Sequence, residues 1–386
     1  MIFILTGGTG GHIVPARCLA IELARQGHKV TVFGDIKYRN YISSNDDFKS
    51  VIIPSTQASS SLIGLAKMLI KISCGSLLSL LHILLKRPSY IIGFGGYATF
   101  PTLIAATLTK RKIILHEQNA HLGKVNRLFA KYAYKIATTF PQTDGIDKSL
   151  QHKVTWVGNP IRDEISRLNF TDYTLPKFAE ESSAELPDNR LGYKVLLASD
   201  FENQSTEIQQ EYFNILIVGG SGGAKIFSDV IPKALFNLSN DFKGKIYVSQ
   251  QCRAELVEST AKQYQAFDMN SHVSAFFYDM PKKIANAHLI IARSGSSSMF
   301  EFCAAKKPMI LIPFAKSADD HQLKNARYCE QNHAAIVIEE KDFTINKIYD
   351  LLKELMTDAE KLETMSQAAG NLARLDATKK LAQLIY

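Results

Sequence analysis

A histidine directly follows a glycine-rich loop near the start of the chain. The apolar run Ile2–Leu5 leads into the loop Thr6–Gly11, and His12 opens the amphipathic stretch that comes next. Backbone amides of such a loop, with the N-terminus of the helix behind it, bind phosphate oxygens. Histidine titrates near neutral pH and is suited to general base catalysis. The spacing therefore predicts a proton-accepting histidine beside a bound phosphate.

Two further glycine loops follow strand-like runs. Gly219–Gly223 comes after Ile215–Val218, and Gly93–Tyr97 comes after Tyr90–Ile92. The same strand, loop and helix unit at the front of each half predicts two similar α/β domains that face each other across a cleft. A phosphorylated or nucleotide substrate is the ligand class that these loops indicate.

Two nucleotide-binding alternatives have weaker support. Gly8, Gly10 and Asp35 partly match the dinucleotide fingerprint, but Ile13 replaces its third glycine or alanine. A dinucleotide at this loop also leaves the other two loops unexplained. The phosphate-binding motif of P-loop NTPases is absent from the sequence.

Short apolar runs alternate with helical stretches along the chain, which is typical of parallel, doubly wound sheets. Pro15 is expected in the first turn of the first helix, which Gly27 ends. Three helices are expected to close the chain, from about Thr344, Asp358 and Ala377. The expected strands are Ile2–Leu5, Val30–Phe33, Tyr90–Ile92, Ile113–Leu115, Ile136–Thr139, Val154–Val157, Ile215–Val218, Ile246–Val248, Leu289–Ala292, Met309–Leu311 and Ala335–Ile338.

A long polar stretch divides the chain into two expected domains. Residues 169–212 are rich in acidic residues, Ser, Asn and Gln, and form too long a connection for the inside of a compact domain. We predict an inserted surface loop there, with a short strand at Lys194–Leu197, and a hinge near 158–160. The expected domains are 1–162 and 163–386, with the last helix, about 376–386, packing back on the first domain.

The composition and net charge of the chain limit the classes of molecule that it is expected to bind. A net charge of +8 favours an anionic partner, such as a phosphate substrate or a membrane surface, although a soluble protein with spare lysines explains it equally well. No basic run interleaved with aromatic residues points to nucleic acid. The five cysteines include no C-x-x-C pair and are expected to be reduced thiols of a cytoplasmic protein, and the first residues lack the pattern of a signal peptide.

One apolar segment, Leu62–Leu85, resembles a membrane span. Its longest uncharged run is Ile72–Leu85, which is short of the roughly 18 residues that a span requires. We predict two helices lying on or in the domain instead. The apolar residues together with Lys67, Lys71, Lys86 and Arg87 suit a surface that sits on anionic lipid, and ordinary core helices with surface lysines explain them equally well.

Seven motifs occur in one order along the chain. They are Gly7–His12, Gly93–Tyr97, His116–Asn119, Val157–Arg162, Gly219–Ser221, Arg293–Gly295 with Glu301, and His321–Ala326. Each is weak alone, but together they resemble the MurG family of peptidoglycan N-acetylglucosaminyltransferases over nearly the whole chain except the insertion. The resemblance implies two Rossmann-like domains of the GT-B fold. It also implies transfer of GlcNAc, with inversion, from UDP-GlcNAc to the muramyl C4 hydroxyl of lipid I, giving lipid II.

On the acceptor side, the resemblance implies that His12 is the general base. Thr9, Gly10 and Gly11 are expected near the sugar and the acceptor phosphates. Asn119 is expected to bind sugar groups, and Arg162 is suited to phosphate.

On the donor side, the resemblance implies that Glu301 binds the ribose hydroxyls and that Gln322 reads the sugar hydroxyls. Phe277 is expected to contact uracil through its backbone, and Ser221 to contact the donor. The expected pyrophosphate cradle and the helix behind it comprise Ser296, Ser297, Ser298, Met299 and Phe300.

Several positions differ from the family pattern. Gly222 replaces the usual Gln, Ser296–Ser298 replaces Ala-Leu-Thr, and Ser249–Gln250 stands for His-Gln. These differences keep a second function open, a nucleotide-sensing or catalytically inactive binding protein. A UDP-GlcNAc 2-epimerase of the same fold is a further alternative, disfavoured because a lipid-acceptor surface and the loop Gly93–Tyr97 would have no use in it.

The resemblance also implies the surroundings of the reaction. No D-x-D motif is present, and no obligatory metal or other cofactor is expected because a helix dipole and backbone amides can stabilise the leaving diphosphate. The expected partners are UDP-GlcNAc, lipid I (undecaprenyl-pyrophosphoryl-MurNAc-pentapeptide) and an anionic membrane surface, without nucleic acid. The expected location is peripheral, on the cytoplasmic face of the bacterial inner membrane, in cell-wall synthesis, cell shape and division.

Overall fold

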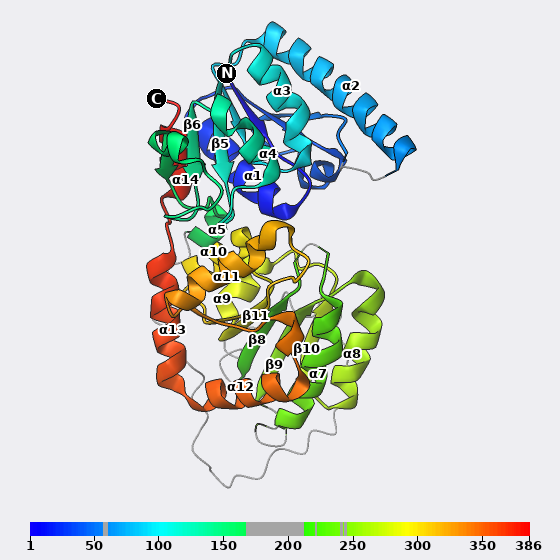
Figure 1. The fold of residues 1–386 in the computed structure, drawn as a ribbon. Helices are drawn as coiled ribbons and strands as arrows, with labels where there is room; N and C mark the ends of the chain where they lie inside the picture. The colour runs from blue at the N-terminus through cyan, green and yellow to red at the C-terminus, as the bar shows by residue number, and fades with distance from the viewer. Residues whose placement is uncertain (57–60, 167–211, 221, 240–241, 243–244) are drawn as a thin grey trace. The chain divides into compact units, whose positions relative to one another are not determined.

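The computed structural model describes residues 1–56, 61–166, 212–220, 222–239, 242 and 245–386 (Figure 1). The predicted insertion up to residue 211, the short strand expected at Lys194–Leu197, and Ser221 lie outside the described residues.

The first sheet has seven parallel strands in the order β3-β2-β1-β4-β5-β6-β7. Every strand expected in this half is confirmed, and β3 is an addition whose partly exposed residues gave no apolar run. The bounds are β1 Ile2–Leu5, β2 Val30–Gly34, β3 Lys49–Ile52, β4 Tyr90–Gly93, β5 Lys112–Glu117, β6 Lys135–Thr138 and β7 Val154–Trp156.

The second sheet has six strands in the order β10-β9-β8-β11-β12-β13. The expected strands are again confirmed, and the polar edge strand β10 is the addition. The bounds are β8 Phe213–Val218, β9 Ile246–Gln251, β10 Asn270–Ser274, β11 Leu289–Ala292, β12 Met309–Leu311 and β13 Ala335–Val337.

Helices connect the strands, as parallel sheets require. They are α1 Gly10–Arg25, α2 Leu62–Lys86, α3 Phe100–Leu108, α4 Lys124–Phe129, α5 Asp163–Ser166, α7 Lys225–Ser239, α8 Val257–Ala266, α9 Met280–Asn286, α10 Ser296–Ala304, α11 His321–Gln331, α12 Ile345–Thr357, α13 Ala359–Leu372 and α14 Ala377–Gln383. The last three begin within one residue of the expected starts.

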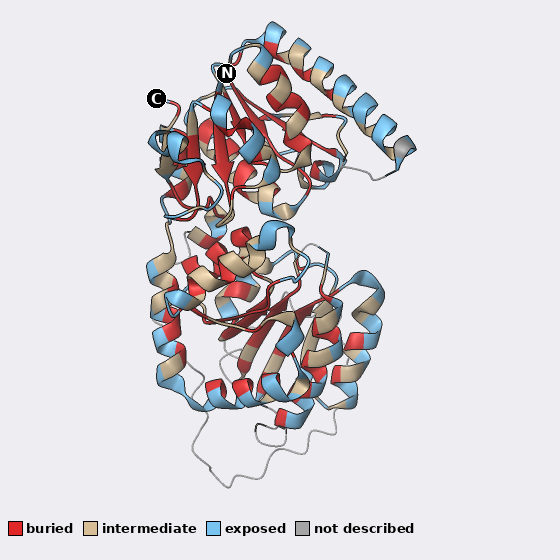
Figure 2. Ribbon diagram, viewed as in Figure 1, coloured by how far each residue is buried: buried red, intermediate tan, exposed pale blue. Residues whose placement is uncertain are grey.

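Strand β1 separates two halves of the first core. Ile2 and Ile4 belong to a buried cluster that also contains residues of α1 and α14, whereas Phe3 and Leu5 belong to a second cluster with residues of α2 and α3. Successive side chains of a strand point to opposite faces, so this alternation places one layer of helices on each face (Figure 2). The strand order reverses between β1 and β4, and therefore the loops after these two neighbouring strands lie side by side at the carboxyl edge of the sheet, where ligands bind in α/β sheets.

Helix α1 begins earlier than expected. It starts at Gly10, with Thr9 as its extended N-cap residue, so the expectation that Pro15 lies in the first turn is wrong. Gly10 and Gly11 adopt helical geometry, and Pro15 lies in the second turn. Gly27, just after the helix, has φ +82°, in agreement with its expected role as the helix terminator.

Helix α2 corrects a second expectation. The segment predicted to form two helices is one continuous helix of 25 residues, because nothing inside it, Gly75 included, breaks the helical backbone. It packs along α3, and much of its surface is exposed (Figures 1 and 2). Ile63–Lys86 is long and apolar enough to cross a membrane by length and composition, with 17% of its most apolar window buried. The short uncharged run therefore does not exclude a span.

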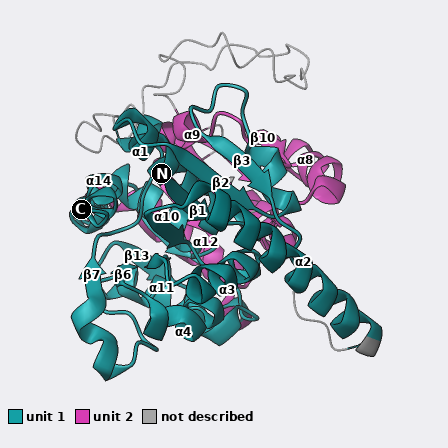
Figure 3. Ribbon diagram, turned by 90° about the horizontal axis from the view of Figure 1, so that it is seen from above, with its two compact units in different colours: residues 1–169, 293–340, 364–386 teal, residues 170–292, 341–363 magenta. Residues whose placement is uncertain are grey.

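Contacts divide the chain into two units (Figure 3). Unit 1 comprises Met1–Asn169, Arg293–Glu340 and Thr364–Tyr386, and unit 2 comprises Phe170–Ala292 and Lys341–Glu363. Helix α14 packs on α1 within unit 1. The domain boundary expected at residue 162 stays a prediction.

Candidate functional site

Helix α1 and the end of β5 hold His12 between them. The glycine loop after β1 brings the helix start to the carboxyl edge of the sheet, so the half-buried His12 lies in the first helical turn. Its Nδ1 atom lies 2.8 Å from Oε1 of Gln118, just after β5. On the other side, Gly96 has φ +78°, and a Cβ atom there would lie 3.0 Å from Cδ2 of His12. The imidazole therefore has a defined position.

A second histidine lies behind Gln118. The Nε2 atom of Gln118 lies 2.9 Å from Nδ1 of His116 and 3.0 Å from the carbonyl oxygen of the same residue. The His116 ring is fully buried, and its Nε2 lies 3.1 Å from the carbonyl oxygen of Gly158. Burial lowers the pKa of His116 to about 4, although the bond to Gly158 opposes the shift. His116 is therefore neutral at physiological pH.

Asp35 connects two of the glycine loops. Its buried carboxylate accepts hydrogen bonds from the backbone N–H of Gly8 at 3.2 Å and from the hydroxyl of Tyr97 at 2.6 Å. It also caps the short helix that follows β2 by accepting from the N–H of Tyr38. Burial and the bond to Asp35 both raise the pKa of Tyr97, so this hydroxyl stays protonated. The loops after β1 and β4 are thus held together.

The N-terminus of α10 contacts both His12-bearing and Gln118-bearing segments within unit 1. The hydroxyl of Ser296 donates to the carbonyl oxygen of Gln118, and that of Ser297 donates to the carbonyl oxygen of Gly11 at 2.8 Å. In a regular helix the N–H of residue 15 bonds this Gly11 oxygen, but Pro15 has no N–H. The proline thus frees an acceptor for the serine.

The rest of α10 carries an ion pair at its centre. Glu301 is 4% exposed, and its two carboxylate oxygens accept from Nε and Nη2 of Arg162 at 2.7 and 2.6 Å. Burial opposes the charge on Arg162, but the hydrogen bonds and attraction of Glu301 outweigh it and raise the guanidinium pKa. Ser298 is half-buried, whereas Met299 and Phe300 are buried, with the Phe300 ring against Phe140.

Asn119 and Asn325 form a pair beside this helix. The Nδ2 group of Asn325 donates to Oδ1 of Asn119 and to the carbonyl oxygen of Ser294, both at 3.1 Å, and its Oδ1 accepts from the N–H of Ala120. Asn119 also donates to Glu117. Gln322, one turn earlier in α11 than Asn325, accepts the N–H of Phe314 with its side-chain oxygen. The end of β5, the start of α10 and α11 are therefore held together by side-chain amides.

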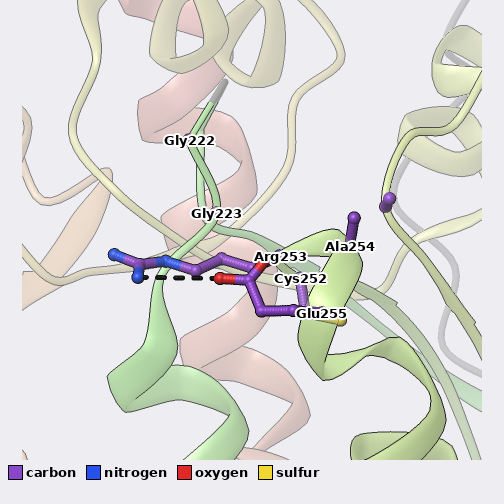
Figure 4. A pocket seen from close by; sticks show the side chains of 7 residues that line it. Gly222, Gly223, Cys252, Arg253, Ala254 and Glu255 are labelled. Carbon is purple, nitrogen blue, oxygen red and sulfur yellow. Dashed lines mark ion pairs between the residues drawn. The ribbon is translucent and has the colours of Figure 1, made fainter.

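Unit 2 contains a separate pocket at its glycine loop (Figure 4). The pocket encloses ≈ 390 Å³ and is lined by Gly222, Gly223, Cys252, Arg253, Ala254, Glu255 and Ala275. Arg253 and Glu255 form a weak ion pair at 3.9 Å. Phe277, two residues after Ala275, is buried and packs edge-on against His272.

Unit 1 contains most of the predicted site residues. It holds Thr9, Gly10, Gly11, His12, Asn119, Arg162, Ser296–Glu301 and Gln322, whereas Phe277 lies in unit 2 and Ser221 lies outside the described residues. Three buried residues, His116, Gln118 and Asn325, belong to the recognised motifs but were missing from the predicted site. These residues form buried hydrogen bonds with site residues that lie far away in the sequence. Such tertiary contacts could not be predicted from the sequence motifs. Within the described part of the chain, no group of three or more His, Cys, Asp or Glu residues could hold a metal ion.

Comparison with protein families gives matches in both halves. Residues 2–138 match the glycosyltransferase family 28 N-terminal domain, and residues 214–384 match the glycosyltransferase family 28 C-terminal domain. A protein of Wolbachia sp. subsp. Drosophila simulans, named UDP-N-acetylglucosamine--N-acetylmuramyl-(pentapeptide) pyrophosphoryl-undecaprenol N-acetylglucosamine transferase, is 33% identical over 384 residues, covering 100% of this chain and 98% of the relative. A protein of the same name from Novosphingobium aromaticivorans is 33% identical over 382 residues, covering 99% of this chain and 90% of the relative.

Solved structures have the same fold. The crystal structure of Acinetobacter baumannii MurG is similar with a TM-score of 0.70 at 24% identity, covering 100% of this chain and 98% of that one. A UDP-GlcNAc 2-epimerase from Neisseria meningitidis, bound to UDP-GlcNAc, is similar with a TM-score of 0.65 at 13% identity, covering 99% of both chains. These likenesses confirm the predicted GT-B fold, which transferases and epimerases share.

Proposed function

We propose that His12 is the general base of this chain, which belongs to glycosyltransferase family 28 and, within it, to the MurG family of N-acetylglucosamine transferases. The chain transfers N-acetylglucosamine from UDP-N-acetylglucosamine to lipid I and so makes lipid II for peptidoglycan. The function expected from the seven motifs is thereby confirmed. The observation that carries the proposed role is the position of His12, held beside the start of α10 in the same unit.

The proposed step is a single displacement. His12 accepts the proton of the muramyl C4 hydroxyl while its oxygen forms a bond to the anomeric carbon of GlcNAc. The bond between that carbon and the β-phosphate oxygen breaks, and its electron pair leaves with UDP. Attack opposite the leaving group inverts the anomeric configuration. Thr9, Gly10 and Gly11 are proposed to lie against the sugar and acceptor phosphates, because they directly precede His12 at the start of the helix.

The start of α10 is proposed to receive the diphosphate of the donor. Ser296–Ser298 form the first turn of this nine-residue helix, where unpaired N–H groups and the helix dipole favour negative charge. Met299 and Phe300 are buried and support this turn from inside the unit. We propose that no metal ion is required. Turnover is expected to be unchanged in excess EDTA, and a loss that Mg²⁺ or Mn²⁺ restores would contradict this.

The ion pair between Arg162 and Glu301 bears on donor binding. Glu301 is proposed to bind the two ribose hydroxyls, yet both of its oxygens already accept from Arg162. The ribose must therefore share the carboxylate or displace the guanidinium, which is then available to a phosphate. Replacing Glu301 with Ala is expected to weaken UDP-GlcNAc binding by about 1–3 kcal/mol, the cost of a lost hydrogen-bonding charge. If calorimetry shows unchanged affinity for UDP-GlcNAc, a group other than Glu301 binds the ribose.

The other predicted contacts remain proposals. Asn119 is proposed to bind sugar groups, and its pairing with Asn325 fixes its amide for this purpose. Gln322 is proposed to read the sugar hydroxyls. The backbone of Phe277, in unit 2, is proposed to contact the donor, and Ser221, outside the described residues, is proposed to do the same.

The decisive experiment measures transfer from labelled UDP-GlcNAc to a short-chain lipid I analogue. We expect His12→Ala to lower kcat by ~10²–10⁴ with donor affinity kept, since a general base acts on the chemical step. Unchanged turnover would remove His12 from catalysis. UDP-ManNAc formed without acceptor would indicate an epimerase, and donor binding without any transfer would indicate a binding protein.

Helix α2 is proposed to attach the protein to the cytoplasmic face of an anionic inner membrane. Its exposed apolar residues are Ile63, Leu65, Leu69, Ile70, Leu77, Leu81, Leu84 and Leu85. Lys67, Lys71, Lys86 and Arg87 are exposed on the same helix or at its end. Apolar burial in the interface and attraction to anionic lipid together support peripheral binding.

Vesicle binding tests the attachment. Binding to anionic vesicles is expected to weaken with salt, and Leu81→Glu is expected to weaken it further, whereas the exposed Leu375→Glu is the control. Equal binding to neutral vesicles would show that attraction to anionic lipid does not contribute to the attachment. Because α2 is also long enough to cross a bilayer, alkaline extraction of membranes is needed. Release of the protein supports a peripheral helix, and retention would contradict it. Protease cleavage of the chain only in inside-out vesicles is expected for the cytoplasmic face.

A further inference from the structure

We propose that Gln118 and His116 are positioning residues that fix His12 in the tautomer with a proton on Nδ1 and a free electron pair on Nε2. The inference rests on the proposed role of His12 as general base. It concerns the chain of contacts His12–Gln118–His116–Gly158, whose members all lie in unit 1.

The carbonyl oxygen of Gly158 determines which ring nitrogen of His116 carries a proton. It lies 3.1 Å from Nε2 of His116 and can only accept, so Nε2 must be the donor. The ring is fully buried, and burial keeps it neutral by lowering its pKa to about 4. A neutral imidazole has a single N–H, and therefore Nδ1 of His116 is an acceptor.

Two acceptors then orient the amide of Gln118. One of its terminal atoms lies 2.9 Å from Nδ1 of His116 and 3.0 Å from the His116 carbonyl oxygen. Only the NH₂ group can donate to both. The carbonyl oxygen alone would settle this end of the amide, so the orientation does not depend on the His116 ring. The other terminal atom, Oε1, therefore faces His12.

Oε1 can only accept, and it lies 2.8 Å from Nδ1 of His12. Nδ1 consequently carries the proton, and Nε2 carries the electron pair that takes the proton of the substrate hydroxyl. Gly96 lies close to the Cδ2 and Nε2 edge of the ring, where a Cβ atom would lie at 3.0 and 3.3 Å, so a larger residue there would displace the ring from this position. After proton transfer, Oε1 still accepts from Nδ1 and stabilises the imidazolium.

The backbone of Gln118 also takes part. Its carbonyl oxygen accepts the hydroxyl of Ser296 at the start of α10, so the residue that orients the base also contacts the proposed diphosphate cradle. Gln118 is 2% exposed, which keeps competing water from its amide.

The spectroscopic test observes the protons directly. In the full-length protein with ¹⁵N-labelled histidine, long-range ¹H–¹⁵N spectra distinguish a protonated from an unprotonated ring nitrogen. When the His12 ring is neutral, we expect Nδ1 of His12 and Nε2 of His116 to be protonated. A proton on Nε2 of neutral His12 would overturn the proposal.

The kinetic test uses Gln118→Met, which keeps the length of the side chain but removes the amide. We expect the neutral His12 ring to divide between its tautomers and kcat to fall about 10–100-fold, with KM of both substrates within about twofold, because the change affects proton transfer. Ser79→Ala removes another buried side-chain hydrogen bond of unit 1, to Thr102, and is the control for a merely structural loss. An unchanged kcat in Gln118→Met would overturn the proposal.

The double variant separates this proposal from the role of His12. If Gln118 acts through His12, Gln118→Met is expected to cause no further loss of kcat in the His12→Ala background. If the losses of kcat from the two substitutions multiply in the double variant, Gln118 does not act by positioning His12. If His12→Ala itself keeps full turnover while the spectra show the expected protons, His12 is not the general base, but the proposed tautomer of its ring is correct.

Discussion

The two glycine loops at the front of the two halves are held in different ways. A Cβ atom on Gly7 would lie 2.6 Å from Cβ of Ala98 and 2.8 Å from Oδ1 of Asp35, because the loop after β1 is wedged against neighbouring side chains. Gly220 and Gly222, in the loop after β8, have no atom within 4 Å of the corresponding position. That loop closes on its own backbone, with the N–H of Gly223 donating to the carbonyl oxygen of Gly220.

The difference shows where the protein fixes its geometry in advance. The loop that carries His12 is connected to Asp35, Tyr97 and Gln118 before any substrate binds, and such preorganisation lowers the barrier of a chemical step. The loop in unit 2 lines a pocket and is unevenly packed: a Cβ atom on Gly223 would lie 2.7 Å from the backbone nitrogen of Arg253, whereas Gly220 and Gly222 have open space.

The largest expected effect is on stability, from alanine at matched glycines. Gly7 has φ +137° and Gly220 has φ +79°, so both substitutions strain the backbone, but only the first also causes a clash. Gly7→Ala is expected to lower the free energy of unfolding by about 3 kcal/mol and Gly220→Ala by about 1 kcal/mol, measured by chemical denaturation. Equal losses would show that the loops do not differ in packing.

The next effect depends on pH. An unfolded histidine titrates near pH 6.5, whereas buried His116 titrates at about 4, so the unfolded chain binds more protons between these values. The contribution of His116 is complete above pH 6.5 and is lost as the pH falls toward 4, by about 2–3 kcal/mol. His116→Asn should remove this part of the slope in denaturation series, with His152→Asn as the exposed control. An unaltered slope would mean that His116 is already charged in the native protein.

A smaller effect is expected at Tyr97. Tyr97→Phe removes the 2.6 Å bond to Asp35 that joins two loops, and its expected cost is about 1–2 kcal/mol since the ring is half-buried. Tyr132→Phe is the exposed control. A cost no greater than that of the control would show that the N–H groups of Gly8 and Tyr38 satisfy the carboxylate without the Tyr97 hydroxyl.

The smallest effect is expected in the loop of unit 2. Gly222 has open space around it and no positive φ, so Gly222→Ala mainly restricts the unfolded chain. Its expected effect is a gain of about 0.5 kcal/mol in the free energy of unfolding. A loss of stability would contradict the contrast between the loops.

Strongly apolar strands could be predicted from the sequence, whereas the two more polar edge strands, β3 and β10, could not. Ile2–Leu5 and Leu289–Ala292 are buried on both faces, and a continuous apolar run identifies such strands. Lys49–Ile52 and Asn270–Ser274 lie at sheet edges, where polar side chains face solvent. Helix α2 was misjudged because charge spacing says little about where a helix ends.

The site could be predicted as motifs but not as contacts. His12 and Glu301 stood out by their place after glycine and serine loops. The role of Gln118 depends on His116 and Gly158, which a strand and a hinge bring to it from different parts of the chain. Pro15, read as a helix start, instead leaves a carbonyl for Ser297. Such pairings follow from topology, which local patterns do not encode.

Helix α14 has a consequence for folding during synthesis. Leu381, Ala382 and Ile385 belong to the same buried cluster as Ile2 and Ile4, and Tyr386 bonds His28 across a separation of 358 residues. At about 5–20 residues per second, the ribosome supplies these side chains roughly 20–75 s after the first strand. One face of the first sheet therefore stays incompletely covered until α14 has been synthesised, so the first half of the chain cannot complete its folding before the second half has been made.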